Sequence, residues 1–568
     1  MTAVPPRNLD IGAALQEALA LQRQGRLRDA EKLFARVLKT APDNFDALHL
    51  LGLVKAQQGQ MGEAHRLMAA AVRVHPGFAD AWLNLANVLH ALRRDADALA
   101  ALDKALALRP GDPEILRHRG NALLALGRAA EAVDAFDRSI NAQPRSADTL
   151  MSRGTALASL GRAAEALADF NAALALAPAH PVALYNRGTA LLDLGRATEA
   201  LADFDRALTA MPDDAKAWNN RGRALQALNR HQEAVESFGK AIALRKDYAD
   251  AHSNRAMSLL TLGDFRQGFA DYEWRWKRSG MSDARRNYRG PLWLGEYPPA
   301  RKRLLLWAEQ GLGDTIQFAR YASLLASMGA TVLLEVQPEL KPLLRGLAGV
   351  TSLHARGEPL PAYDMHCPLG SLPLALKTEP QAVPADSPYV HADASRVDKW
   401  RPRVDSLPGR RVAIAWAGHA RHANDRNRSI DLALLAPLFA CEGISFISVQ
   451  RDLRNGDAER LARHGNVAAF GPSLDDMADT AAVLALCDLL IAVDTSVVHL
   501  AGAMARPAWV MLPFSPDWRW TLQDERSPWY PQLRLFRQSM PGDWPGLVAR
   551  VIEALKATST MTDLGLSR

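Results

Sequence analysis

Cysteine is scarce in this sequence. Cys367, Cys441 and Cys487 are the three cysteines among 568 residues. An odd and widely spaced set does not form a disulfide framework, and no two of them lie close enough for a zinc knuckle. We therefore expect no structural metal and no cofactor held by thiolates.

Long apolar runs are also missing. The most apolar stretch, Val483 to Val493, is interrupted by Asp488 and is far shorter than the ~20 residues that cross a bilayer. Residues 1–9 lack the apolar centre of a secretory signal. These absences predict a cytoplasmic protein without a membrane span.

A large excess of one charge is missing as well. Lysine and arginine number 68 against 62 aspartates and glutamates, for a net charge of +6. This excess is small for the length, so we expect no nucleic-acid partner. The length itself predicts several domains, because one domain usually has roughly 100–200 residues.

The first half of the chain is periodic. Three residue types recur every 34 positions, and each keeps its own register: Pro42, Pro76, Pro110, Pro144, Pro178 and Pro212; Gly25, Gly59, Gly127, Gly161, Gly195 and Gly263, with Arg93 and Asn229 in the two remaining places; and Ala30, Ala64, Ala98, Ala132, Ala166, Ala200 and Ala234. Phenylalanine four residues after alanine, as in Ala132 and Phe136, completes the tetratricopeptide pattern.

This period predicts an all-α solenoid over residues 8–279, with seven repeats and a degenerate eighth. Each repeat is a pair of helices that buries its apolar face against its neighbours. Glycine or asparagine should end the first helix in the left-handed conformation, and proline should open the next repeat. In the eighth unit Lys246, Gly268 and Tyr272 replace proline, alanine and phenylalanine, which suggests a cap.

A polar stripe follows the first helices of the repeats. One position carries Asn84, His118, Ser152, Asn186, Asn220 and Asn254, and the position three residues later carries Asn87, Asn121, Thr155, Thr189 and Arg223. Residues three apart share a helix face. The asparagines Asn84, Asn186, Asn220 and Asn254 could bind an extended acceptor, or the stripe could simply face water and help the repeats stack.

The second half of the chain has a different pattern. Residues 280–300 resemble a linker, and short apolar runs then alternate with helical stretches. The expected strands are Leu304–Trp307, Val332–Val336, Arg411–Ala417, Ser445–Val449, Leu489–Val493 and Ala508–Leu512, with a helix from about Asp314 to Met328. Alternation of this kind predicts doubly wound parallel sheets. We expect one lobe over 301–400, a second over 401–560, and a cleft at the carboxyl ends of their strands.

Two motifs follow expected strands. Gly311, Gly313 and Asp314 come after the first strand, and the glycines would let the backbone approach a ligand. No third glycine and no lysine follow, so neither a dinucleotide fingerprint nor a Walker motif is complete. Asp314 could be a helix N-cap or a general base.

The second motif, Asp494-Thr495-Ser496-Val497-Val498-His499, follows the strand Leu489–Val493. Thr495 and Ser496 would stand at the positive end of a helix, where a diphosphate could bind. Capping alone would also explain them, and His499 could be a packed residue instead of a ligand contact.

Two further segments end at the same predicted sheet edge. The stretch His419 to Ser429 contains Arg421, Arg426 and Arg428, whose guanidinium groups suit phosphate. His419 and His422 have no evident third partner, so we expect no metal. Trp518 and Trp520 could stack on a ligand or pack between the lobes.

The second half resembles the bacterial heptosyltransferases, glycosyltransferase family nine, over about 300–540. Gly-Leu-Gly-Asp at 311–314 and Asp-Thr-Ser-Val-Val-His at 494–499 carry the resemblance, although Ser496 replaces a glycine and the family's phosphate-binding lysine has no clear match. The resemblance implies a GT-B fold, Asp314 as the base, and Asp494, Thr495 and His499 near the donor, with Arg426 or Arg428 in place of the lysine. A solenoid joined to such a domain is also similar, in architecture, to protein O-GlcNAc transferases.

The sequence therefore predicts an inverting, metal-independent glycosyltransferase. A nucleotide-sugar donor would bind the C-terminal lobe, and the repeats would recruit a protein or glycan acceptor. The absence of an Asp-x-Asp motif from the second half agrees with this. The alternative is a non-catalytic scaffold with a degenerate sugar-nucleotide domain, and the test is whether Asp314 and the helix after Thr495 face one another across the cleft.

Overall fold

The computed structural model describes residues 10–278, 288–384, 387–420 and 424–558. The chain divides into two compact units, Met1–Asp213 and Asp214–Arg568. Of the predicted linker at 280–300, residues 280–287 lie outside the described residues, as do Arg421 and His422.

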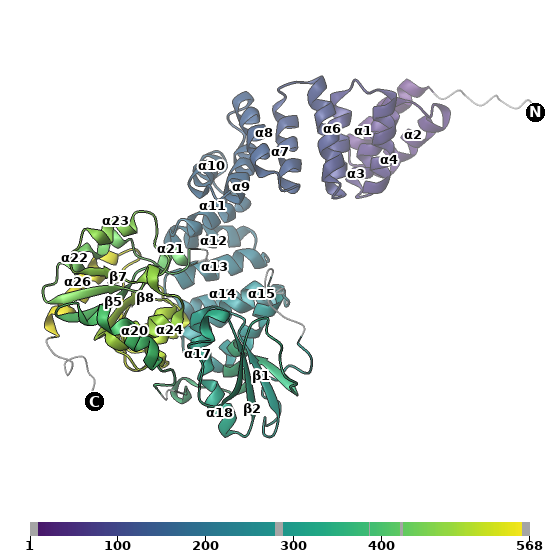
Figure 1. Ribbon diagram of the computed structural model, residues 1–568. Coiled ribbons are helices and arrows are strands. Elements are labelled where there is room, and N and C mark those ends of the chain that lie inside the picture. Colours follow the sequence, from purple (N-terminus) through teal and green to yellow (C-terminus); the bar gives the residue numbers. More distant parts are fainter. Residues whose placement is uncertain (1–9, 279–287, 385–386, 421–423, 559–568) are drawn as a thin grey trace, which may run out of the picture. The chain divides into compact units, whose positions relative to one another are not determined.

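Within its described residues, 10–213, the first unit consists of six helical pairs (Figure 1). Their bounds follow the 34-residue period: α1 (Ile11–Arg23) and α2 (Leu27–Thr40), α3 (Phe45–Gln57) and α4 (Met61–Val74), α5 (Ala79–Ala91) and α6 (Asp95–Leu108), α7 (Pro113–Ala125) and α8 (Ala129–Ala142), α9 (Ala147–Ser159) and α10 (Ala163–Leu176), and α11 (Pro181–Asp193) and α12 (Ala197–Ala210). The recurring alanines are fully buried, because small side chains let the paired helices approach.

The turn inside each pair is left-handed, as predicted. Gly25 has φ +75° and the other recurring glycines are similar, while Arg93 and Asn229 adopt φ +60° and +58° in the same place. A residue without a Cβ atom enters this region at little cost, and asparagine tolerates it better than most others.

The recurring prolines do not open the repeats, so that prediction was wrong. Helix α2 ends at Thr40, its C-cap is Ala41, and Pro42 comes next; α3 then begins at Phe45 with Asn44 as its N-cap. The proline therefore lies just beyond the second helix of each pair, where its ring prevents continuation of that helix.

The second unit begins with two more helical pairs, α13 (Ala215–Ala227) and α14 (His231–Leu244), then α15 (Ala249–Thr261) and α16 (Phe265–Tyr272). Helix α16 is short and continues into the 3-10 helix η1 (Glu273–Lys277). Phe265, Phe269 and Tyr272 belong to the same apolar core as Leu304 and Leu306 of the first strand. The last pair is thus packed against the α/β part of this unit.

A four-stranded parallel sheet follows. Its strands are β1 (Arg303–Trp307), β2 (Thr331–Val336), β3 (Val350–Ala355) and β4 (Met365–Pro368), in the order β3-β2-β1-β4. The helix predicted from Asp314 is two helices, α17 (Leu312–Ala319) and α18 (Tyr321–Ser327). Between them, Arg320 donates hydrogen bonds to the carbonyls of Pro384 and Trp529, at 2.9 and 2.8 Å.

A six-stranded parallel sheet completes the unit. Its strands are β5 (Arg410–Ala415), β6 (Ile444–Ser448), β7 (Val467–Ala469), β8 (Leu489–Val493), β9 (Ala508–Leu512) and β10 (Leu533–Arg537), in the order β10-β9-β8-β5-β6-β7. This is the 3-2-1-4-5-6 order of doubly wound sheets, in which ligands bind where the order reverses. That point lies between β5 and β8.

Helices cover both faces of the six-stranded sheet (Figure 1). On one face, Ala413 and Ala415 share a core with α20 (Ala394–Asp405), α24 (Met477–Leu486) and α25 (Ser496–Ala503). On the other face, Val412 and Ile414 pack with α22 (Ala436–Phe439) and α26 (Trp544–Ala557). The short helices α21 (Asp425–Arg428) and α23 (Asp457–Ala462) follow β5 and β6. No helix among the described residues is long and apolar enough to cross a membrane.

Candidate functional site

One cleft lies at the carboxyl ends of both sheets of the second unit, with a volume of about 830 Å³. The loop after β1 contributes Gly311, and the start of α17 contributes Gly313 and Asp314. The loop after β8 contributes Asp494 and Thr495, and α25 contributes Ser496 and His499. The two predicted motifs therefore face the same space. Their approach is close, because a Cβ atom on Gly313 would stand 2.7 Å from Cδ2 of His499.

Asp314 is not the N-cap of α17. Gly311 is the N-cap, and Asp314 is the third helical residue, whose Oδ2 accepts a hydrogen bond from the Gly311 N–H at 3.0 Å. This is the carboxylate half of a capping box. The side chain of Asp314 remains 25% exposed toward the cleft.

Arg519 is the partner of Asp314, and the sequence analysis missed it. Its Nη2 lies 2.5 Å from Oδ1 of Asp314, its Nη1 lies 2.8 Å from Oδ1 of Asp517, and its Nε donates to Gln317. Burial lowers the pKa of Arg519, but Asp517 and Asp314 outweigh burial and hold that pKa above its ordinary value. Arg519 stands between Trp518 and Trp520, which are 4% and 0% exposed, so those rings pack in the core instead of facing a ligand.

The helix after β8 begins at the cleft, and the side chain of its N-cap residue makes no hydrogen bond within the described part of the chain. Thr495 is the N-cap of α25 with an extended backbone, but its side chain makes no capping hydrogen bond. Its Oγ1 is buried and has no hydrogen-bond partner among the described residues. Together with the free N–H groups at the start of the helix, this geometry suits an anion.

Arg428 reaches the cleft, whereas Arg426 does not line it. Both belong to α21, but Arg426 is exposed. The Arg428 guanidinium packs over Gly418, where an added Cβ atom would stand 2.7 Å from Nη2. Nε of Arg428 has no hydrogen-bond partner in the described part of the chain. The cleft thus has a cation directed at the same space as the α25 N-terminus.

Two groups in the cleft have shifted pKa values. Burial, with a smaller contribution from Asp517, raises the pKa of Asp494 above its ordinary value. Burial lowers the pKa of His499 far below its ordinary value, and neighbouring arginines add to this. Burial thus favours the neutral form of His499, whose Nδ1 lies 3.2 Å from the Tyr530 hydroxyl. His419 also lines the cleft, but within the described ranges no cluster of three His, Cys, Asp or Glu could hold a metal ion.

The asparagines of the solenoid stripe contact neighbouring repeats. Nδ2 of Asn84 lies 3.0 Å from Nε2 of His49, Nδ2 of Asn186 lies 3.3 Å from Oγ1 of Thr155, and Nδ2 of Asn254 lies 3.0 Å from Oδ1 of Asn219. Asn220 is 7% exposed. These amides link successive repeats. Binding of an acceptor by the partly exposed Asn84, Asn186 and Asn254 stays a prediction.

Comparison with known families identifies the repeats. Two models described as "Tetratricopeptide repeat" match the chain, one at residues 15–64, 49–113 and 118–181 and the other at 180–247. Tetratricopeptide repeats therefore extend across about the first 250 residues.

Among curated proteins, Protein FlbA of Caulobacter vibrioides is 28% identical over 326 residues, which cover 52% of this chain and 53% of FlbA. The chain thus spans about half the length of this relative. Among solved structures, a tetratricopeptide repeat protein from Parabacteroides merdae is 20% identical, covering 44% of this chain and 98% of that one with a TM-score of 0.37. YrrB, described as a TPR protein with an unusual peptide-binding site, is 27% identical, covering 32% and 95% with a TM-score of 0.29.

Proposed function

We propose that this protein is a glycosyltransferase that moves a sugar from a nucleotide-sugar donor to a protein or glycan acceptor recruited by the repeats. One observation carries the proposal: the carboxylate of Asp314, in the helix after β1, lines the same cleft as Thr495, Ser496 and Arg428, which follow strands of the second sheet. The two parallel sheets would be the two lobes of a GT-B fold, with the acceptor on the side of the first sheet.

The donor would bind the second sheet at the point where its strand order reverses. Its diphosphate would receive hydrogen bonds from the N–H groups at the start of α25, from Oγ1 of Thr495 and from Arg428. In the heptosyltransferase family, which the chain resembles, a lysine serves the phosphate. Arg428 is better placed than Arg426 to take that role, because Arg428 lines the cleft.

Asp314 would act as the base. It would take the proton of an acceptor hydroxyl while that oxygen attacks the anomeric carbon, and the bond between this carbon and the diphosphate oxygen would break with inversion. The negative charge that develops on the leaving nucleoside diphosphate would be stabilised by Arg428 and the α25 N-terminus, without a metal ion. Both Asp314 oxygens already accept one hydrogen bond, but a carboxylate oxygen has two lone pairs.

The contacts of Asp314 with Gly311 and Arg519 favour a second candidate function. If Asp314 serves only the capping box and the ion pair with Arg519, the cleft would be a sugar-nucleotide binding site without catalysis, and the protein a repeat scaffold. A cytoplasmic location is part of both proposals, and the free, buried Cys367, Cys441 and Cys487 fit a reducing compartment.

Thermal-shift measurements on the full chain test the proposal. Nucleoside diphosphates and nucleotide sugars with uracil, guanine, adenine, cytosine or thymine bases should be compared, because a ligand that binds the folded state raises the melting temperature. We expect one base to stabilise the protein both as the diphosphate and as the nucleotide sugar, in the presence of a chelator. A cooperative melt that no member of the panel shifts would exclude a nucleotide site.

A further inference from the structure

Asn229 occupies the turn of the seventh repeat, where most repeats have glycine, and its side chain contacts the α/β part of the second unit. Six of the eight left-handed turn positions hold glycine, and the two exceptions are Arg93 and Asn229. Nδ2 of Asn229 donates to the Phe514 carbonyl at 2.7 Å. Nearby, Oγ of Ser515 donates to the Gln226 carbonyl at 3.0 Å. The turn between α13 and α14, inside the seventh repeat, thus holds the loop that follows β9.

Tyr272 is a second departure of this kind. It occupies the place of the recurring phenylalanine, which is Phe238 in the preceding repeat. Its hydroxyl, which a phenylalanine would lack, accepts a hydrogen bond from Nε2 of Gln310. Gln310 lines the cleft and precedes Gly311 in the loop after β1. The eighth repeat therefore holds the other cleft loop.

Arg275, three residues beyond Tyr272, strengthens the same attachment. Its Nη2 donates to Oγ of Ser371 at 2.7 Å and to Oε1 of Glu309 at 3.2 Å. The side chains of Arg275 and Glu309 are 6% and 1% exposed. Arg275 also pairs with Glu273, with Nη1 2.5 Å from Oε1. Loss of Arg275 would leave the buried Glu309 carboxylate without its cation, which is costly. Glu309 lies in the loop that joins β1 to α17, the helix that contains Asp314.

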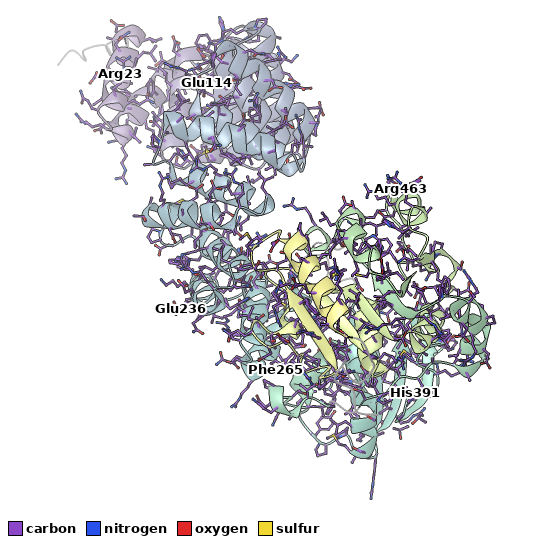
Figure 2. All side chains as sticks on the ribbon, turned by 90° about the vertical axis from the view of Figure 1, so that its left-hand side faces the viewer. Arg23, Glu114, Glu236, Phe265, His391 and Arg463 are labelled. Carbon is purple, nitrogen blue, oxygen red and sulfur yellow. The ribbon has the colours of Figure 1, made fainter. Side chains whose placement is uncertain are left out.

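Aromatic packing joins the last repeat to the second loop as well. Phe265, labelled in Figure 2, and Phe269 lie edge-on to Trp518, with ring centroids 6.1 and 5.6 Å apart. Trp518 precedes Arg519, the partner of Asp314. Both loops that meet in the Asp314–Arg519 ion pair are thus attached to the last two repeats.

We propose that Asn229, Tyr272 and Arg275 are positioning residues for the cleft, so that the last two repeats are part of the catalytic apparatus. They fix the loops at 309–314 and 513–519, and thereby the geometry of Asp314 and Arg519. The consequence for catalysis rests on the proposed function, whereas the attachment of the loops does not. Asn229 and Tyr272 thus depart from the repeat pattern because they hold the cleft loops in place. A repeat that only capped the solenoid would need neither residue.

Two variants that restore the recurring residue test the proposal in the full chain. Asn229→Gly and Tyr272→Phe each remove one hydrogen bond to a cleft loop and keep the repeat pattern, so the solenoid should fold. Arg93→Gly is the matched control, since it makes the same restoration in the first unit. Amide hydrogen exchange should become roughly three- to tenfold faster at 513–519 in Asn229→Gly and at 309–315 in Tyr272→Phe, and remain unchanged in both loops in Arg93→Gly.

Turnover of the nucleotide sugar gives the second readout. We expect kcat to fall in both variants with little change in donor KM, whereas Arg93→Gly keeps wild-type kcat. Unchanged exchange in both loops, in variants that melt cooperatively, would overturn the positioning proposal. If one variant fails to fold, the other tests it on its own loop. A wild type that turns over no donor, with exchange responding as expected, would refute the transferase and leave the attachment standing.

Discussion

Replacement of Arg428 by glutamine should weaken nucleotide binding strongly, and the structure offers an internal control. Arg428 and Arg426 belong to the same short helix, α21, but Arg428 lines the cleft and Arg426 is exposed. Arg428→Gln and Arg426→Gln remove the same charge from nearly the same place in the fold. The long-range electrostatic loss should therefore be similar, and the direct contact should differ.

The expected magnitude follows from the contact. A hydrogen bond to a charged group contributes about 1.5–3 kcal/mol, and a guanidinium can engage two phosphate oxygens at once. Loss of this contact corresponds to roughly a tenfold to hundredfold increase in Kd. For Arg426→Gln, a change of less than about threefold is expected, because charges separated by solvent are screened at physiological ionic strength.

Isothermal titration calorimetry with the nucleoside diphosphate selected by thermal shift is the assay. Both variants should be titrated at the same salt concentration, with melting curves to confirm that each is folded. Equal weakening by the two substitutions would mean that only overall charge matters. Unchanged affinity in Arg428→Gln would remove Arg428 from the donor site and refute the reasoning.

Three further predictions concern the acceptor, packing and pH. Replacing the partly exposed Asn186 and Asn254 together by alanine should raise the KM for a macromolecular acceptor by roughly one to two decades and spare hydrolysis of the donor by water. If the variant unfolds, or binds the acceptor as before, these amides do not bind the acceptor. In the seventh repeat, Gly222→Ala should lower the free energy of unfolding by about 1–2 kcal/mol, because the added Cβ atom would stand 2.5 Å from the Phe238 ring. Gly239→Ala should raise that free energy by about 0.5–1 kcal/mol, because Gly239 has open space around it. Denaturant unfolding in which both variants change stability in the same direction would contradict this packing. Burial raises the pKa of Glu309 to about 7, so below that pH the folded state binds a proton that the unfolded state does not bind. The wild type should therefore gain stability relative to Glu309→Gln as the pH falls from about 8 to about 5. A difference in melting temperature between the two proteins that does not depend on pH would count against the raised pKa.

The repeats could be predicted from the sequence because one local pattern recurs. The left-handed turns at Gly25 and Asn229 follow from backbone sterics alone. The place of Pro42 was predicted wrongly, because a proline fits both just after one helix and at the start of the next. The start of α3 is instead marked by Asn44, whose side chain caps it.

In the α/β half, every predicted strand is an interior strand and every missed strand is an edge. β3 and β4 are the edge strands of the first sheet, and β7 and β10 are the edge strands of the second. Interior parallel strands are covered on both faces and appear as continuous apolar runs, as in Leu489–Val493. Edge strands are short or mixed with polar residues, as in Val467–Ala469 and Leu533–Arg537, so their composition does not distinguish them from loops.

The candidate site was predictable where it follows from strand ends, and not where it depends on distant pairing. Gly313 and His499 meet because both motifs follow parallel strands at the same cleft. Arg519 could not be assigned to Asp314, since 205 positions separate them. The sequence feature closest to Arg519 was the pair of tryptophans Trp518 and Trp520. Both side chains are buried, and their burial holds the arginine between them in place.

The most direct test of the proposed function compares the wild type with Asp314→Asn. Asparagine keeps the side-chain oxygen that caps α17, but it cannot accept the acceptor's proton at neutral pH. Mass spectrometry should follow release of the nucleoside diphosphate from the selected nucleotide sugar, in the presence of a chelator, with calorimetry of the diphosphate in parallel. The account predicts turnover by the wild type and its loss in Asp314→Asn, with diphosphate affinity nearly unchanged. Wild-type turnover by Asp314→Asn, or no turnover by a wild type that binds the donor, would contradict it.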